Sequence, residues 1–182
     1  MDKFAVIGLG YVGLRGALSL SKHKQSVIGF DVSKTRLSEI ANGIDSNLDI
    51  STEQLKNYTI QLTDDKEKLR EANFYIVDIG TPVNVFYIPD MSTLKAVCKV
   101  LGTVLKKGDI VVFESTVYPG ATEEVLVPLL EQLSGLKSGQ DFLVGYSPER
   151  IVPGDAEHDV TNIKKIVSGQ NEVALKRIMQ AF

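Results

Sequence analysis

Apolar and polar positions alternate along the chain in blocks of two kinds. Short apolar runs, rich in β-branched and aromatic residues, have the length and composition of strands that are buried on both faces. Between them lie longer stretches in which apolar residues recur at the spacing of an amphipathic helix. Repeated strand–helix units predict an α/β fold with a mainly parallel sheet, right-handed crossovers and helices on both faces. The strand-like runs are FAVIG, SVIGFD, FYIVDIG, DIVVFE and DFLVGY, and the helical stretches are residues 11–22, SKTRLSEIAN, MSTLKAVCKVLGTVL and ATEEVLVPLLEQL.

Two stretches with weaker patterns interrupt this alternation, at residues 44–65 and 84–90. We predict that both form loops or short helices over the sheet. Near the end of the chain, residues 161–169 are predicted to form one more strand, and residues 171–182 a closing helix. Residues 1–182 are therefore expected to form one domain.

The first strand-to-helix connection, VIGLGYVGLRG, places Gly8, Gly10 and Gly13 in G-x-G-x-x-G spacing. A second strand then ends in Asp31, 18 residues after Gly13. In this context Gly8 permits the tight turn, Gly10 lets the backbone approach a pyrophosphate, and Gly13 lets the helix pack on the strand. The alternative is a tight turn without a ligand. The full pattern favours a Rossmann-like, doubly wound domain that binds a dinucleotide.

Asp31 also bears on the choice of dinucleotide. Its carboxylate is expected to accept hydrogen bonds from the adenosine ribose and to repel a 2′-phosphate, which favours NAD over NADP. Lys34 and Arg36 complicate this prediction, since either side chain could reach a phosphate. Arg36 could instead stack on the adenine, or simply be solvated. The candidate cofactor-binding residues are Gly8, Gly10, Tyr11, Val12, Gly13, Asp31, Arg36, Thr81, Ser115 and Thr116.

Polar side chains follow several of the other predicted strands. Thr81 comes after one strand, Glu114, Ser115 and Thr116 after the next, and residues 147–150 after another. Ligands of doubly wound sheets bind beyond the carboxyl ends of the strands, where these residues are expected to converge. Each group alone could serve as a helix cap or a turn. Together with the glycine loop they indicate an active site.

Composition narrows the functions that are possible. The chain has 182 residues, of which 43% are hydrophobic and 24% charged, as in an ordinary globular domain. A net charge of −3 argues against a nucleic-acid partner, which would require a basic face. The apolar runs are too short to span a membrane, and the N-terminus lacks the apolar segment of a signal peptide. These features favour a cytoplasmic protein with neither nucleic acid nor membrane as a partner.

The single cysteine and the two histidines offer little chemistry. Cys98 lies at helical spacing from several apolar residues, so we expect it to be buried with a structural role and not to act as a nucleophile. His23 and His158 are far apart in sequence, so no metal motif is visible. His158 follows the loop that holds residues 147–150, and either a proton-transfer role or a plain loop position is open to it.

Six motifs, in this order, resemble the UDP-sugar 6-dehydrogenases, and they are most similar to the bacterial branch that acts on UDP-N-acetylhexosamines in capsule and O-antigen synthesis. The resemblance covers nearly the whole chain. It implies two successive hydride transfers to NAD⁺, which convert the sugar C6 alcohol to a carboxylate through a cysteine thioester. The motifs are VIGLGYVGL, GFDVSKTRL, TPV, ESTVYPGATEE, GYSPERIVPGD and HDVTNIKKIVSG.

The resemblance also assigns roles to residues at the strand ends. Glu149 matches the family's active-site glutamate, which handles protons and water during thioester hydrolysis, and Thr116 matches the threonine that helps to place that water. Arg150 falls near the substrate or the cofactor, so Glu149 and Arg150 are the candidate substrate residues. Without the resemblance, a local ion pair between Glu149 and Arg150 is an equal alternative.

This sequence also departs from the family pattern. Arg15, Gly80 and Val152 stand where other residues are usual, and Asp78 stands where a small or apolar residue is expected. A buried Asp78 would need a partner for its charge.

The family's nucleophilic cysteine, in a Gly-Gly-x-Cys-x-Pro-type motif, and the helix with Lys and Asn before it are not in this sequence. Full members run to about twice this length, with a second Rossmann-like domain for the UDP-sugar. We therefore expect the N-terminal half of an enzyme that is a homodimer or a higher homo-oligomer when full length. Two other functions stay open: an NAD-dependent hydroxyacid or sugar-phosphate dehydrogenase, and a standalone NAD-sensing module without catalysis.

Overall fold

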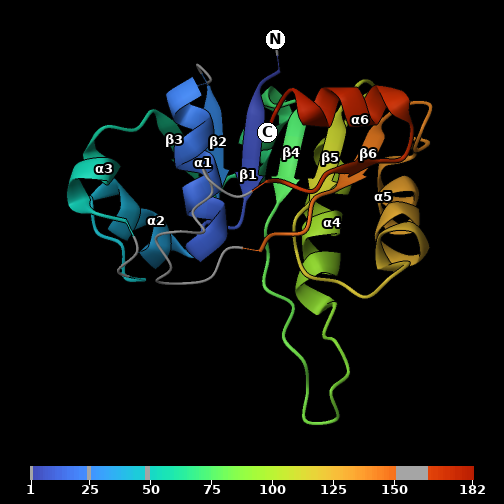
Figure 1. The fold of residues 1–182 in the computed structure, drawn as a ribbon, viewed down its shortest axis with the longest axis horizontal. Coiled ribbons are helices and arrows are strands. Elements are labelled where there is room, and N and C mark those ends of the chain that lie inside the picture. The colour runs from blue at the N-terminus through green and yellow to red at the C-terminus, as the bar shows by residue number, and fades with distance from the viewer. Residues whose placement is uncertain (1, 24–25, 48–49, 151–163) are drawn as a thin grey trace.

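The computed structural model describes residues 2–23, 26–47, 50–150 and 164–182, and it contains one seven-stranded sheet (Figure 1). The sheet order is β3-β2-β1-β4-β5-β6-β7, and every neighbouring pair is parallel except β6 with β7. The chain therefore starts in the middle of the sheet and winds outward in both directions, as predicted for a doubly wound fold. The strands are β1 (Phe4–Ile7), β2 (Val27–Phe30), β3 (Ile60–Thr63), β4 (Phe74–Val77), β5 (Ile110–Phe113), β6 (Leu143–Tyr146) and β7 (Ser168–Gly169).

Helices cover both faces of the sheet (Figure 1). α1 (Tyr11–His23) and α6 (Glu172–Met179) pack on one face, and α4 (Ser92–Val104) and α5 (Val127–Ser134) pack on the other. Each face has its own hydrophobic core, because alternate residues of the buried strands point to opposite sides. The remaining helical elements are α2 (Lys34–Ala41), α3 (Thr52–Lys56), the 3₁₀ helix η1 (Lys66–Glu71) and the π-helical turn η2 (Thr122–Leu126).

Residues 44–65 differ from the prediction at one point. The expected short helix is present as α3, which begins with a capping box formed by Ser51 and Gln54. The same stretch also contains β3, a strand that the pattern did not indicate. β3 lies at the edge of the sheet, and of its four residues only Ile60 is buried. Because its other positions include Gln61 and Thr63, it shows no apolar run.

The remaining weak stretches agree better with the prediction. Residues 84–90 form a loop as predicted, but this loop extends away from the body of the domain and does not lie over the sheet (Figure 1). Of residues 161–169, the described part contains only the two-residue strand β7, which pairs antiparallel with β6. The closing helix is confirmed as α6. In the described ranges of the chain, no helix is long and apolar enough to cross a membrane.

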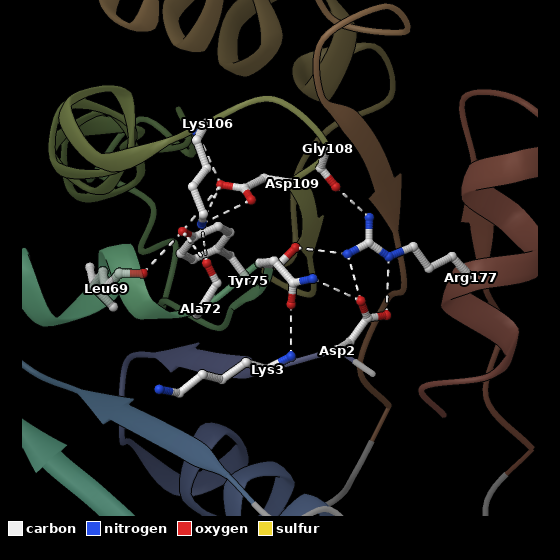
Figure 2. A network of polar contacts seen from close by, with 10 residues as sticks. Asp2, Lys3, Leu69, Ala72, Tyr75, Lys106, Gly108, Asp109 and Arg177 are labelled. Atoms are coloured by element: carbon white, nitrogen blue, oxygen red, sulfur yellow. Dashed lines mark hydrogen bonds and ion pairs between the residues drawn. The ribbon is translucent and has the colours of Figure 1, made fainter.

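A polar network joins α6 to the amino edge of the sheet (Figure 2). The Arg177 guanidinium donates two hydrogen bonds to the Asp2 carboxylate, at 3.0 and 2.7 Å. It also donates to the carbonyl oxygens of Gly108 at 2.6 Å and Asn73 at 3.0 Å. Nearby, the Tyr75 hydroxyl lies within hydrogen-bond distance of two carbonyl oxygens, at 3.0 Å each. These contacts fix the sheet at the edge opposite the glycine loop.

We expect Arg177→Met to destabilise the domain by about 1–3 kcal/mol, because the Asp2 carboxylate and the carbonyl oxygens of Gly108 and Asn73 each lose a hydrogen bond from the guanidinium. Urea unfolding measures the change, and Lys176→Met on the exposed side of α6 is the matched control. Equal midpoints for Arg177→Met and the unmodified chain would contradict the structural role of this network.

Candidate functional site

The parallel register places the residues that follow four strands in one row. The N–H of Asp78 donates to the last carbonyl of β1 at 2.9 Å, that of Glu114 to the last carbonyl of β4 at 2.8 Å, and that of Ser147 to the last carbonyl of β5 at 2.9 Å. Gly8 continues the row on the other side, since its N–H donates to the last carbonyl of β2 at 2.9 Å. A glycine, two carboxyl groups and a hydroxyl therefore share the carboxyl edge of the sheet, as the sequence predicts.

The three glycines of the loop meet different surroundings. Gly8 has a φ of 92°, and a Cβ there would lie 2.2 Å from the Asp78 carbonyl oxygen. A Cβ on Gly13 would lie 1.9 Å from the Gly8 carbonyl oxygen, so both glycines are required for packing. A Cβ on Gly10 would meet nothing within 4 Å. Gly10 therefore leaves open space at the start of α1, where the helix dipole favours an anion. This opening fits a dinucleotide pyrophosphate.

Asp31 and Arg36 hold the same residue of the glycine loop, Leu9, through its two backbone groups. The Asp31 carboxylate accepts hydrogen bonds from the N–H groups of Leu9 at 2.9 Å and Ser33 at 2.8 Å. Arg36 Nε donates to the Leu9 carbonyl oxygen at 2.8 Å, and its Nη1 lies 2.8 Å from the buried Asp45 carboxylate. The side chain of Arg36 is only 11% exposed, so the prediction of a solvated Arg36 is wrong. Burial against Asp45 is the reason.

A cavity adjoins this loop on the α4 side of the sheet. Its walls are mostly apolar, and the Asp31 carboxyl group stands among them. Apolar walls suit a base, and a carboxylate suits the ribose hydroxyls, so the residues present fit an adenosine. The lining includes Ile7, Gly8, Phe30, Asp31, Ile79 and Val97.

The hydroxyl residues of the edge have separate contacts. Ser115 is buried, and its Oγ accepts a hydrogen bond from the Ile79 N–H at 2.9 Å. Thr81 Oγ1 donates to the Thr116 carbonyl oxygen, while Thr116 itself is exposed at the edge. In α1, Tyr11 is half-buried, and the ring lies under the Arg15 guanidinium at 5.2 Å. Their predicted roles toward the cofactor stay predictions.

Glu149 is held by a lysine that the sequence analysis did not single out. Lys165 Nζ contacts Glu149 Oε2 and also lies 2.6 Å from Glu114 Oε1. The side chains are 14% exposed for Lys165, 7% for Glu149 and 5% for Glu114. The Arg150 guanidinium does not pair with Glu149 but donates a hydrogen bond to the Lys164 carbonyl oxygen. The structure therefore pairs Glu149 with Lys165, in place of the local Glu149–Arg150 pair.

Burial and like charges perturb the ionisation of this cluster. Burial, together with the nearby charges of Glu114 and Glu149, raises the pKa of Asp78 to about 7, although Lys165 and the Gly13 N–H act in the opposite direction. Burial also raises the pKa of Glu114. For Lys165, burial lowers the pKa, but the two glutamates outweigh burial and the pKa is raised. Asp78 is half-buried, and the groups that favour its ionised form are the nearby Lys165 charge and the Gly13 N–H.

Three further residues stand out in the sequence. Cys98 is fully buried on α4, as expected, and burial raises the pKa of its thiol to about 12. His158 and Val152 lie outside the described residues. Within the described ranges, no group of three His, Cys, Asp or Glu side chains is arranged to hold a metal ion.

A model of the NAD-binding domain of the UDP-glucose/GDP-mannose dehydrogenase family matches residues 2–182. The chain belongs to this family. It is 53% identical over 181 residues to the UDP-N-acetyl-D-glucosamine 6-dehydrogenase of Salmonella typhi, covering 99% of this chain and 42% of that protein. It is 46% identical over 179 residues to Protein CapL of Staphylococcus aureus, covering 98% of this chain and 42% of CapL.

Solved structures give the same result. The UDP-D-ManNAc dehydrogenase of Pyrococcus horikoshii superposes with a TM-score of 0.90 at 31% identity, covering 98% of this chain and 44% of that chain. The chain thus spans less than half the length of these relatives. The family match confirms the Rossmann-like fold and NAD as the cofactor, and it argues against a hydroxyacid or sugar-phosphate dehydrogenase.

We expect Gly10→Val to weaken NAD⁺ binding at least tenfold, about 1.4 kcal/mol, without unfolding the domain. The new side chain would meet no protein atom near its Cβ, but it would fill the space that the pyrophosphate needs. Calorimetry measures the affinity and circular dichroism checks the fold. Gly13→Ala is the contrasting variant and should lose stability, because its Cβ would overlap the Gly8 carbonyl oxygen. Unchanged NAD⁺ affinity in folded Gly10→Val would show that the loop is only a turn.

We expect Asp78→Asn to stabilise the domain at alkaline pH. The pKa of Asp78 is about 7 in the folded chain and about 3.9 in an unfolded one, so the folded state keeps a proton that the unfolded state has lost. The stability that this proton supplies is complete below about pH 4 and is lost as the pH rises through about 7. An asparagine stays neutral and can still accept from Gly13.

The variant should therefore gain about 1–3 kcal/mol over the unmodified chain near pH 8, with the gain shrinking toward about pH 4. Urea unfolding at several pH values gives the difference, with the exposed Asp64→Asn as control. A gain for Asp78→Asn that is the same at every pH would count against a buried, protonated Asp78.

Proposed function

We propose that this chain is the NAD-binding half of a nucleotide-sugar 6-dehydrogenase, which oxidises the C6 alcohol of a UDP-N-acetylhexosamine to the uronic acid in two NAD-dependent steps. The observation that carries the proposal is the position of Glu149. Its carboxylate is buried in an ion pair beside the row of strand ends that begins at the glycine loop. The 53% identity to a UDP-N-acetyl-D-glucosamine 6-dehydrogenase supports the substrate class, and the similarity to CapL supports a role in surface polysaccharide synthesis.

In this proposal the glycine loop and Asp31 hold the cofactor, and NAD⁺, when bound, supplies the hydride acceptor. The open space at Gly10 and the amino end of α1 receive the pyrophosphate. Asp31 accepts hydrogen bonds from the ribose hydroxyls while it keeps its contact with Leu9. A 2′-phosphate would meet the Asp31 charge, so NADP⁺ should bind less well. Arg36 holds this loop in place through its hydrogen bond to the Leu9 carbonyl oxygen.

Glu149 acts as the general base in the hydrolysis of the thioester. It takes a proton from water, the water oxygen forms a bond to the thioester carbon, and the cysteine leaves as a thiolate. Thr116 is exposed at the same edge and helps to place the water. Arg150, the other candidate substrate residue, lies near the substrate in this proposal. The cysteine is not Cys98, whose thiol is fully buried with a pKa of about 12.

The nucleophile therefore lies beyond these residues, in a UDP-sugar domain that they join by a central helix. We expect the longer protein to be cytoplasmic and to form a homodimer or a higher homo-oligomer. A standalone NAD-sensing module, which requires no catalytic thiol, is the second candidate. The two candidates differ in one assay, since only the first predicts NADH formation with a UDP-sugar by the longer protein.

We expect Glu149→Gln, in the longer protein, to slow thioester hydrolysis by about 10²–10⁴-fold, because the general base is lost. The covalent intermediate should then accumulate and appear in intact-mass spectra after mixing with NAD⁺ and UDP-N-acetylglucosamine. Glu172→Gln, at an exposed acid on α6, serves as control and should leave no such species. Turnover of Glu149→Gln at the normal rate would end the assignment.

A further inference from the structure

We propose that Lys165 is a positioning residue, which fixes the Glu149 carboxylate against the rigid end of β5 and keeps it ionised for proton transfer. This inference rests on the proposed function of Glu149. The contact itself is a property of this chain and can be tested without any substrate.

Glu114 is the fixed point of the arrangement. It directly follows β5, and its N–H continues the sheet ladder to the last carbonyl of β4 at 2.8 Å. Its carboxylate lies 2.6 Å from Lys165 Nζ, and the same ammonium contacts Glu149 Oε2. Glu149 itself lies on a loop, three residues beyond the end of β6. Lys165 thus transmits the rigidity of the sheet to a carboxylate that its own backbone would hold less firmly.

The charges of the cluster give Lys165 a second role. Asp78, Glu114 and Glu149 are three carboxyl groups near one ammonium, and all are largely removed from water. A carboxylate buried among like charges takes up a proton unless a cation is close. A protonated Glu149 could not act as a base. The Arg150 N–H also donates a hydrogen bond to Glu149 Oε1, at 2.6 Å, and helps to hold the carboxylate in place.

The α1 residues that line the cavity beside this group carry no charge. Glu114, Glu149 and Lys165 line one cavity between α1 and the end of the described chain. Lys165 Nζ lies 5.0 Å from the centre of the Phe182 ring there. The α1 residues that line this cavity, none of which titrates, are Val12, Gly13, Gly16, Ser19 and Leu20.

A second contact ties the same two segments together. The Arg150 guanidinium donates to the Lys164 carbonyl oxygen, so residues 149–150 meet residues 164–165 at two adjacent points. Because Lys164 contributes only its backbone to this contact, its exposed side chain can be changed without breaking it. Lys164→Met is therefore a matched control for Lys165→Met.

The test compares Lys165→Met, Lys165→Arg and Lys164→Met in the longer protein. Lys165→Met should slow thioester hydrolysis by about 10²-fold or more, and it should move the acidic limb of the pH–rate profile to higher pH. NAD⁺ affinity should change by less than about threefold, because the Gly10 and Asp31 contacts are untouched. Lys165→Arg, which keeps the cation, should recover most of the rate and the original profile.

Loss of rate with an unmoved pH profile, or an equal loss in Lys164→Met, would overturn the proposal. If Lys165→Met fails to fold, Lys165→Gln replaces it under the same criteria. A readout without substrate separates this inference from the proposed function: the ¹³C carboxyl resonance of Glu149 should titrate at higher pH in Lys165→Met than in the unmodified protein. If the unmodified protein oxidises no UDP-sugar, the proposed function is wrong. An unchanged Glu149 titration in Lys165→Met would by itself refute the inference.

Discussion

The shared register of the parallel strands β1, β4, β5 and β6 is the constraint on which the rest of the structure depends. Because each strand ends level with its neighbour, Gly8, Asp78, Glu114 and Ser147 form one row, each tied by its N–H to the adjacent strand. The hydrogen bonds between the strand backbones thus set where the carboxyl groups lie. A shift of one residue in the register of any of these strands would turn the side chain at the end of that strand to the other face of the sheet.

The same row creates an electrostatic conflict that the site resolves locally. Asp78 and Glu114 put negative charge beside a glycine loop that is suited to an anion. Lys165 compensates two of the carboxylates, and the raised pKa of Asp78 lets that group stay partly protonated near neutral pH. Asp78 also contacts the backbone of Gly13, so the loop and the carboxyl cluster form one unit.

Much of this arrangement was predictable from the sequence, because strand ends and glycine spacing follow from local patterns. The glycine loop, Asp31 and the strand ends around Glu114 lie where the sequence placed them. The strand β3 was missed because an edge strand with polar positions carries little periodic signal. The pairing of Lys165 with Glu149 bridges 16 positions in sequence and depends on how α6 and β7 return to the sheet, which no local pattern encodes. A lysine at the start of the strand-like stretch IVSG was the one available signal.

A structure of this chain with NAD⁺ bound tests the account most directly, because the described residues line a cavity on each face of the sheet edge and only one of these two should take the cofactor. The account predicts the pyrophosphate over Gly10 and the adenosine ribose on Asp31, with the Lys165–Glu149 contact intact. A dinucleotide in the other cavity, between α1 and Phe182, or one that leaves Asp31 without a ribose contact, would contradict it.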